Sequence, residues 1–288
     1  MFEKVNPCHP DKVADRIAGA IVDLAYTKNK DPKVAVEVLL GHGKATVMIE
    51  SSEDFRPVEI DPIVRRLAGD VELDLHAVKQ DPHLANNQEG AVRCGDNGIF
   101  KGCPPTHEQQ LLTDVVADIY KVFPYDGKYT IHIPQGEQFA EITACQSHVF
   151  TDRDTEDLIV AAWGNNRNDD PIFNGIWKIN PLGEWTGGPD VDCGATNRKL
   201  GSDMGDGVTG GGLHGKDLSK ADVSVNIWCY LESIRTGHEV TACCSIGDES
   251  VGGVPYADIV EQARLYIHTI GGFEKFAMWG LIRPNTDL

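Results

Sequence analysis

Apolar residues fall at helical spacing in some stretches of the chain and gather into short β-like runs in others. Between Pro10 and Lys28 they lie three or four residues apart, which predicts an amphipathic helix with proline at its first position. The helix expected at 106–123 begins with a capping box formed by Thr106 and Gln109. The same spacing predicts further helices at 57–68, 154–163, 221–234 and 256–269.

Runs of valine, leucine and isoleucine on either side of short glycine turns predict β-hairpins. The first hairpin has strands at 33–40 and 44–50, the second has strands at 128–134 and 138–149, and a third strand unit begins at 238–246. Sheet-then-helix units that begin near residues 33, 128 and 238 predict an α+β fold with three pseudo-repeated units, each an antiparallel sheet with helices on one face. We place these units at 1–100, 101–179 and 180–288, and allow for their interleaving.

Composition and charge narrow the class of protein. The chain has 288 residues, of which 41% are hydrophobic, so it can form real cores. Its 26 Lys and Arg against 44 Asp and Glu give a net charge of −18, which argues against general binding to nucleic acid or anionic lipid. We expect a cytoplasmic protein with no membrane span, because no apolar run is long enough and the N-terminus lacks a signal-like core. Eight cysteines without a CxxC pair favour reduced thiols.

Glycine is concentrated between residues 187 and 222, where ten of the thirty glycines lie. Such backbone turns sharply or lies close to a ligand. Basic side chains among backbone N–H groups hold anions, and carboxylates beside them hold the divalent cation that accompanies phosphate. The region therefore predicts a polyphosphate site. The charged residues that suit such a site are Asp192, Arg198, Lys199, Lys216, Asp217, Lys220 and Asp222.

Six segments in order carry a resemblance to S-adenosylmethionine synthetases. Taken alone, His9 could be an ordinary helix cap and Asp11 a first-turn acid. The order of the segments along the chain makes chance an unlikely explanation. They lie at residues 9–12 (HPDK), 34–37 (VAVE), 79–84 (KQDPHL), 94–98 (CGDNG), 180–199 and 210–222, and the resemblance extends from about residue 3 to 247.

The resemblance implies that the methionine sulfur displaces tripolyphosphate from the ribose C5′ of ATP, and that the tripolyphosphate is then cut to pyrophosphate and phosphate. It places the catalytic basic residues at His9, Lys128, Arg198, Lys199, Lys216 and Lys220. It places Mg²⁺ at Asp11 and Asp222, and K⁺ at Glu37. The implied ATP-binding residues are His9, Asp96, Lys128, Trp185, Asp192, Arg198, Lys199 and Lys216. The implied methionine contacts are Glu50, Gln80, Asp192 and Lys220.

Structural explanations stay open for three of these residues. Glu37 could be an edge-strand solubiliser, Trp185 a core aromatic, and Lys128 a solvated strand start. The chain is also shorter than the usual family member and departs from its motifs. The departures are Asn6-Pro7-Cys8 for the family's Ser-Glu-Gly, His83 for an Asp, Glu184 for an Arg, Trp185 for a Phe and Asn197 for a Gly.

The resemblance also implies a homodimer at least, with a tetramer as the alternative, and active sites between subunits. Sheets with helices on one face only offer a physical reason for pairing. Two other functions remain as alternatives. One is a Mg-dependent polyphosphate or nucleotide hydrolase that has lost methionine, and the other is a non-catalytic ATP-binding subunit.

Overall fold

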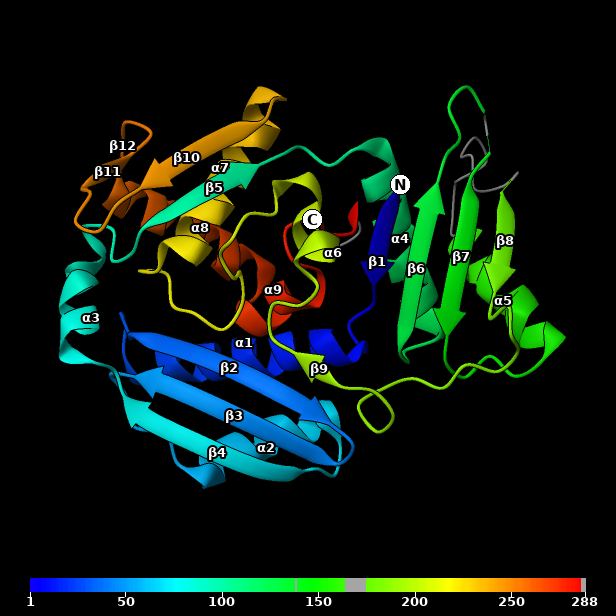
Figure 1. Cartoon of the computed structure of the whole chain (residues 1–288), viewed down its shortest axis with the longest axis horizontal. Helices are drawn as coiled ribbons and strands as arrows, with labels where there is room; N and C mark the ends of the chain where they lie inside the picture. The colour runs from blue at the N-terminus through cyan, green and yellow to red at the C-terminus, as the bar shows by residue number, and fades with distance from the viewer. Residues whose placement is uncertain (138, 164–174, 286–288) are drawn as a thin grey trace.

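The first of two similar four-stranded sheets is built on the N-terminal hairpin (Figure 1). The hairpin turn has positive φ at Gly41, His42 and Gly43, a conformation that glycine adopts without strain. In order, the strands are β4 (Glu72–Lys79), β3 (Lys44–Ser51), β2 (Val34–Gly41) and β9 (Gly194–Ala195). The β2–β3 hairpin and the β2–β9 pair are antiparallel, and β4 pairs parallel to β3 after α2 (Pro57–Ala68). The computed structural model describes residues 1–137, 139–163 and 175–285.

The second sheet repeats this design. Its central hairpin is antiparallel, an antiparallel strand joins one side, and a parallel strand joins the other side after α5 (Asp152–Trp163). In order, its strands are β1 (Phe2–Val5), β6 (Gly127–His132), β7 (Glu141–Gln146) and β8 (Ile176–Ile179). Each parallel pair arises because a helix returns the chain across the sheet, so that the next strand runs in the same direction.

A smaller sheet and hairpin make up the third unit within the described residues. Strand β5 (Gly98–Gly102) pairs antiparallel with β10 (Val240–Cys244), and β11 (Ser250–Val251) pairs with β12 (Val254–Pro255). A helix precedes the hairpin region of every unit and another follows it. The preceding helices are α1 (Pro10–Lys28), α4 (His107–Val122) and α7 (Ala221–Thr236), and the last following helix is α8 (Tyr256–Ile270).

The α+β class and its repeated units are confirmed. The sheets are not purely antiparallel as predicted, because β3–β4 and β7–β8 pair parallel. The six predicted helices are present with ends within two residues of those expected. The predicted start of the second strand of the second hairpin, Gln138, lies outside the described residues. Strands β1, β5 and β9 each lie in the sheet of another unit, which is interleaving in space, and the division of the chain at residues 100 and 180 stays a prediction.

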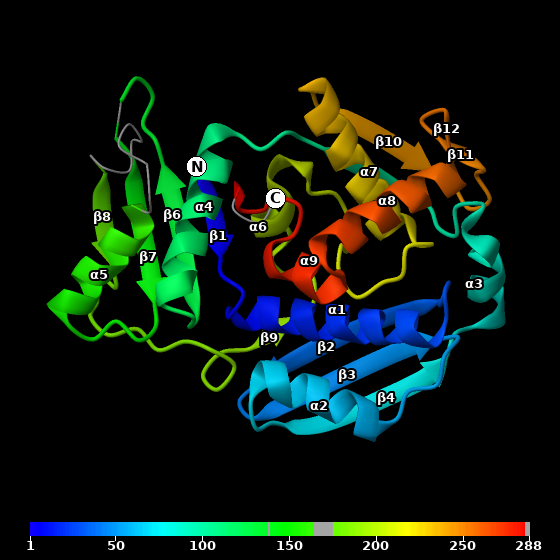
Figure 2. The same cartoon turned by 180° about the vertical axis from the view of Figure 1, so that it is seen from behind.

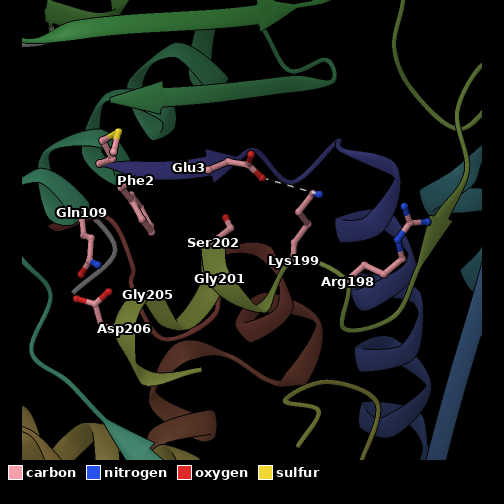
Figure 3. Close-up of a pocket in the computed structure, with 10 residues that line it drawn as sticks. Phe2, Glu3, Gln109, Arg198, Lys199, Gly201, Ser202, Gly205 and Asp206 are labelled. Atoms are coloured by element: carbon pink, nitrogen blue, oxygen red, sulfur yellow. Dashed lines mark ion pairs between the residues drawn. The ribbon is translucent and has the colours of Figure 1, made fainter. Parts of the chain in front are cut away.

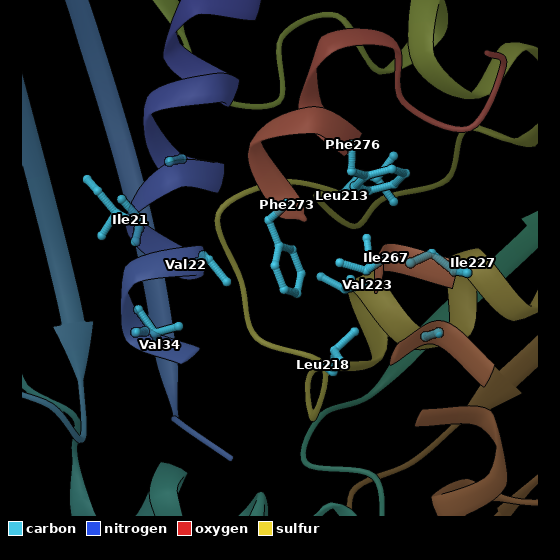
Figure 4. Packing of buried hydrophobic residues seen from close by; sticks show 14 of the residues in the cluster. Ile21, Val22, Val34, Leu213, Leu218, Val223, Ile227, Ile267, Phe273 and Phe276 are labelled. Atoms are coloured by element: carbon cyan, nitrogen blue, oxygen red, sulfur yellow. The ribbon is translucent and has the colours of Figure 1, made fainter. Parts of the chain in front are cut away.

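Helix α1 lies between the first sheet and the C-terminal helices (Figures 1 and 2). Its residues Ile21 and Val22 are buried, and Val22 faces Phe273 of α9 (Phe273–Trp279), as Figure 4 shows. Tyr26 stacks on the same Phe273 ring with centroids 5.4 Å apart. Each such side chain contributes about 1.5–3 kcal/mol on burial, so this packing fixes α1 and the site residues at its N-terminus.

A second apolar core lies under the second sheet and holds α4 and α5 against β6 and β7. The remaining short elements are α3 (Pro82–Asn87), the 3₁₀ turns η1 (Glu89–Ala91) and η2 (Gly205–Gly207), and α6 (Leu200–Met204). Within the described residues, no helix combines the length and apolar character needed to span a bilayer.

Candidate active site

The N-terminus of α1 places His9 and Asp11 at the centre of the first cluster of predicted site residues. His9 is the N-cap, and the Asp11 amide N–H donates to His9 Nδ1 at 3.2 Å. Burial lowers the pKa of His9 to about 4, although the Asp11 carboxylate opposes this shift. The ring is therefore neutral at pH 7, and because Nδ1 accepts a hydrogen bond, the proton lies on Nε2.

Asp11 holds the cation-bearing loop against the start of α1. Its carboxylate is buried and accepts the Ala195 N–H at 2.9 Å. Arg198 Nε lies 3.4 Å from Oδ1 and Lys199 Nζ lies 3.6 Å from Oδ2. The loop can come this close only because residue 194 is glycine, since a Cβ there would lie 2.1 Å from the Pro10 carbonyl oxygen. Segments that are 184 or more residues apart in sequence thus form one charged cluster.

The cluster continues across β1 and β6. Glu3 on β1 pairs with Lys128 at 3.0 Å and with Lys199 at 3.9 Å. Figure 3 shows Lys199 pointing toward Glu3, while the half-exposed Arg198 side chain points to the other side of the loop. Lys199 lines a pocket of about 310 Å³, together with Phe2, Gln109, Ser202 and Asp206. Two predicted cations, Arg198 and Lys199, therefore line this pocket, and Lys128 is linked to it through Glu3.

Asp126 belongs to this site, and sequence reasoning missed it. Its Oδ2 accepts the Gly188 N–H at 2.7 Å, whereas Oδ1 is buried and has no hydrogen-bond partner among the described residues. Burial raises the pKa of Asp126 to about 6, with smaller contributions from Asp192 and Asp11. Trp185 lies beside it, because a Cβ on Gly187 would meet both Asp126 Oδ2 and the Trp185 ring within 2.7 Å. The only sequence signal for Asp126 was its position two residues before Lys128.

A second cluster forms where the glycine run meets the N-terminus of α7. Lys216 pairs with Asp222 in the first turn of this helix, and Lys220 is the N-cap. A Cβ on Gly211 would lie 2.2 Å from Asp222 Oδ1, so glycine lets the backbone pass close to the carboxylate. Asn97 and Gly98 line a pocket with these residues, and Asp96 precedes them with its Oδ1 bound to the Asn97 N–H.

The two predicted magnesium carboxylates lie in different clusters. Asp11 contacts Arg198 and Lys199 in the first, and Asp222 contacts Lys216 in the second. One chain thus carries two distinct charged clusters.

The remaining predicted residues lie around these clusters. Glu37 accepts a hydrogen bond from Thr196 Oγ1 on the outer face of the first sheet, and Glu50 is exposed on β3. Gln80 donates to Gln88 Oε1 at 3.2 Å, and its own Oε1 is buried without a hydrogen-bond partner among the described residues. Asp192 is exposed and accepts the Cys193 N–H. None of these four residues forms a hydrogen bond or ion pair with the Asp11 carboxylate.

A buried ionic group lies directly behind the first cluster. Asp15, Asp203 and His214 have the donor atoms of a metal site, and in the described part of the chain they are the only such group. However, Lys12 Nζ lies 2.6 Å from Asp203 and 3.1 Å from Asp15. Burial disfavours the charged form of Lys12, but the nearby carboxylates of Asp203 and Asp15 outweigh this effect and raise the pKa of Lys12. The ammonium takes the place of a metal ion, so this group is structural.

Comparison with known proteins gives matches in one family. The model for the N-terminal domain of S-adenosylmethionine synthetase matches residues 1–87. The S-adenosylmethionine synthase of Methylobacterium nodulans is 29% identical over 280 residues, which cover 77% of this chain and 69% of that protein. The enzyme of the same name from Nitrobacter hamburgensis is 26% identical over 335 residues, which cover 93% of this chain and 80% of that protein.

A solved structure of an unusual S-adenosylmethionine synthetase from Campylobacter jejuni has the same fold. Its TM-score is 0.73 at 21% identity, with 98% of this chain and 94% of that chain covered. The sequence matches and the fold together confirm the resemblance that the six motifs carry.

Proposed function

We propose that this chain, a compact and divergent relative of the S-adenosylmethionine synthetases, forms S-adenosylmethionine from ATP and L-methionine. The methionine sulfur attacks ribose C5′, the C5′–O5′ bond breaks, and tripolyphosphate leaves and is hydrolysed to pyrophosphate and phosphate. One observation carries the proposal most strongly. The buried Asp11 at the start of α1 holds Arg198 and Lys199 beside a neutral His9, which is a preformed site for a leaving polyanion.

The residues of the first cluster suit this chemistry. Cations that are in place before reaction stabilise the charge that develops on the leaving tripolyphosphate, and we assign this role to Lys128, Arg198 and Lys199. A thioether nucleophile has no proton to remove, so no general base is required. His9 instead presents Nε2–H as a donor, and we assign it to the oxygen of the breaking C5′–O5′ bond.

Asp126 supplies a buried acceptor without a donor. We propose that a hydroxyl or amino group of the nucleotide donates to its Oδ1, with Trp185 beside the adenine. An aromatic ring can stack on a base whether it is Trp or Phe. Lys216 and Lys220 contact the triphosphate from the second cluster, and Glu50, Gln80, Asp96 and Asp192 serve the methionine and ribose.

Two carboxylates of the chain fit a magnesium ion. Asp222 lies against the bare backbone of Gly211, and the carboxylates of Asp11 and Asp222 are the hard oxygen donors that Mg²⁺ prefers. Bound Mg²⁺ would neutralise part of the triphosphate charge. For K⁺, Glu37 supplies one carboxylate, and further ligands would have to come from outside its described contacts.

We propose that the site is completed between two subunits, in a dimer at least. This is supported by the contacts of the two predicted magnesium carboxylates, because Asp11 and Asp222 have no partner in common among the described residues. The outer face of the first sheet offers apolar side chains that a second copy would bury. These are Leu39, Met48 and Val78, which are 57%, 41% and 52% exposed.

The direct test supplies the purified protein with ATP, methionine, Mg²⁺ and K⁺ and measures S-adenosylmethionine by mass. Omission of each component in turn tests the substrate and the ion assignments. Release of phosphate from ATP or tripolyphosphate without S-adenosylmethionine would instead favour the hydrolase. Binding of ATP with no turnover would favour the non-catalytic subunit.

Subunit mixing tests the shared site. Arg198→Leu and Lys216→Met should each inactivate the enzyme, one in each cluster. If every site combines the two clusters from different subunits, mixed dimers regain one intact site, and an equimolar exchanged mixture recovers about a quarter of wild-type activity. If both clusters of one chain serve the same site, the mixture stays inactive.

A further inference from the structure

We propose that Asn197 is a positioning residue that fixes the two cation-bearing loops to each other. The inference rests on the proposed function. Asn197 directly precedes Arg198, and the loop it contacts leads into Lys216. The related family has glycine at this position, so the side chain is a feature of this chain.

Three hydrogen bonds join the Asn197 amide to the glycine-rich loop. The Leu213 and His214 N–H groups both donate to Asn197 Oδ1 at 2.9 Å, and Asn197 Nδ2 donates to the His214 carbonyl oxygen at 3.2 Å. Both ends of the amide are therefore used, and Leu213 and His214 are buried. A single side chain satisfies three backbone groups that would otherwise need water or another partner.

The backbone of Asn197 is fixed from the opposite side. Its N–H donates to Asp15 Oδ1 at 2.8 Å, and Asp15 belongs to the buried ionic group with Lys12 on α1. Its φ is 63°, in the left-handed region that asparagine and glycine tolerate better than most other residues. Asn197 is thus anchored to α1 through its main chain and to the second loop through its side chain.

Gly212 makes room for the amide. A Cβ on Gly212 would lie 2.8 Å from Asn197 Nδ2, so a larger residue there would displace the amide. The asparagine and the glycine therefore fit together as a pair. Since a misplacement of about 1 Å can cost about a hundredfold in rate, a link between these loops bears directly on where Arg198 and Lys216 meet a triphosphate.

The test compares four proteins: wild type, Asn197→Gly, Asn197→Asp and Asn180→Gly. Glycine keeps the left-handed backbone and removes only the three side-chain bonds. Aspartate keeps the acceptor for Leu213 and His214. Asn180 is the matched control, since its φ is 41° and its amide also bonds backbone on both sides, to N–H and C=O of Gln146 at 2.9 Å each.

We expect Asn197→Gly to lower kcat about tenfold or more while the KM for methionine stays within about twofold. Asn197→Asp should recover most of this loss. Asn180→Gly should lower the melting temperature but leave kcat within about twofold of wild type. The proposal is overturned if Asn197→Gly keeps wild-type kcat, if Asn180→Gly loses as much, or if Asn197→Asp falls as far as glycine.

A binding measurement separates this inference from the proposed function. Calorimetric titration with inorganic tripolyphosphate and Mg²⁺ needs no methionine and no turnover. If wild type makes no S-adenosylmethionine, the proposed function has failed, and the titration then decides the role of Asn197. An affinity about tenfold weaker in Asn197→Gly supports the link between the loops, and an unchanged affinity refutes it.

Discussion

Replacing Asp126 with asparagine should stabilise the protein and weaken its handling of ATP. The carboxylate is almost fully buried, lies near Asp11 and Asp192, and has one oxygen without a hydrogen-bond partner among the described residues. Asparagine keeps an acceptor for the Gly188 N–H and removes the buried charge. A buried charge that lowers the stability of the substrate-free protein is a feature that active sites retain.

The size and the pH dependence of the effect follow from the pKa. Burial raises the pKa of Asp126 from 3.8 to about 6, a shift of about two units, or about 3 kcal/mol. Above pH 6 the carboxylate is ionised in both the folded and the unfolded chain, so the folded state carries the whole cost. Below pH 4 it is protonated in both, and the cost is absent. The cost therefore grows as the pH rises from about 4 to 6.

Urea unfolding at pH 8 and pH 4 measures this directly. We expect Asp126→Asn to gain about 1–3 kcal/mol in free energy of unfolding at pH 8, since the new amide N–H₂ itself lacks a partner, and almost nothing at pH 4. Asp190→Asn removes the same charge from an exposed position and should change little. In Asp126→Asn the KM for ATP should also rise. A loss of stability at pH 8, or an equal gain at both pH values, would refute the reasoning.

Two further predictions concern the clusters. Asp222→Asn should remove most Mg²⁺-dependent synthesis without unfolding the protein, because it loses a carboxylate that fits Mg²⁺; a titration of rate against Mg²⁺ checks this, and wild-type dependence would exclude the assignment. His9→Asn should depress synthesis far more than hydrolysis of added tripolyphosphate, since the Nε2–H donor serves only the first step. Equal losses in both assays would contradict that role, and Lys101→Met, which removes the ion pair of Lys101 with Glu239 and no contact of His9 or Asp222, is the control for both.

Periodicity was sufficient to predict the six longer helices, because each presents one apolar face to a core, but it did not predict the short helices α3, α6 and α9. Strand β4 was missed although Leu73 and Leu75 alternate with Asp74 and His76, which is a strand signal in its own right. Residues 80–84, recognised above only as part of a motif, lead into helix α3, where the Asp81 carboxylate accepts hydrogen bonds from the N–H groups of His83 and Leu84. An aspartate followed by proline is a helix-start signal that sequence reasoning passed over.

Only the site residues that lie in recognised motifs could be predicted from the sequence. The approach of Arg198 and Lys199 to Asp11 joins segments that no local pattern relates, and the motif order alone made that pairing foreseeable. Asp126 lies in no motif that was recognised, and its importance comes from burial, which depends on the packing of distant loops. Local sequence carries little information about burial of a single acidic residue.

The pairing of charges explains how so acidic a chain can receive a polyphosphate. Each described cluster balances its cations with its own acids, Arg198 and Lys199 with Asp11, and Lys216 with Asp222. These pairs keep the cations in place and limit the cost of their burial before substrate arrives. On the proposed function, a triphosphate that enters with Mg²⁺ would displace the carboxylates from the cations, and the freed carboxylates would be available to hold the metal ion. The two exchanges would offset each other, which neither the anion nor the metal ion alone would provide.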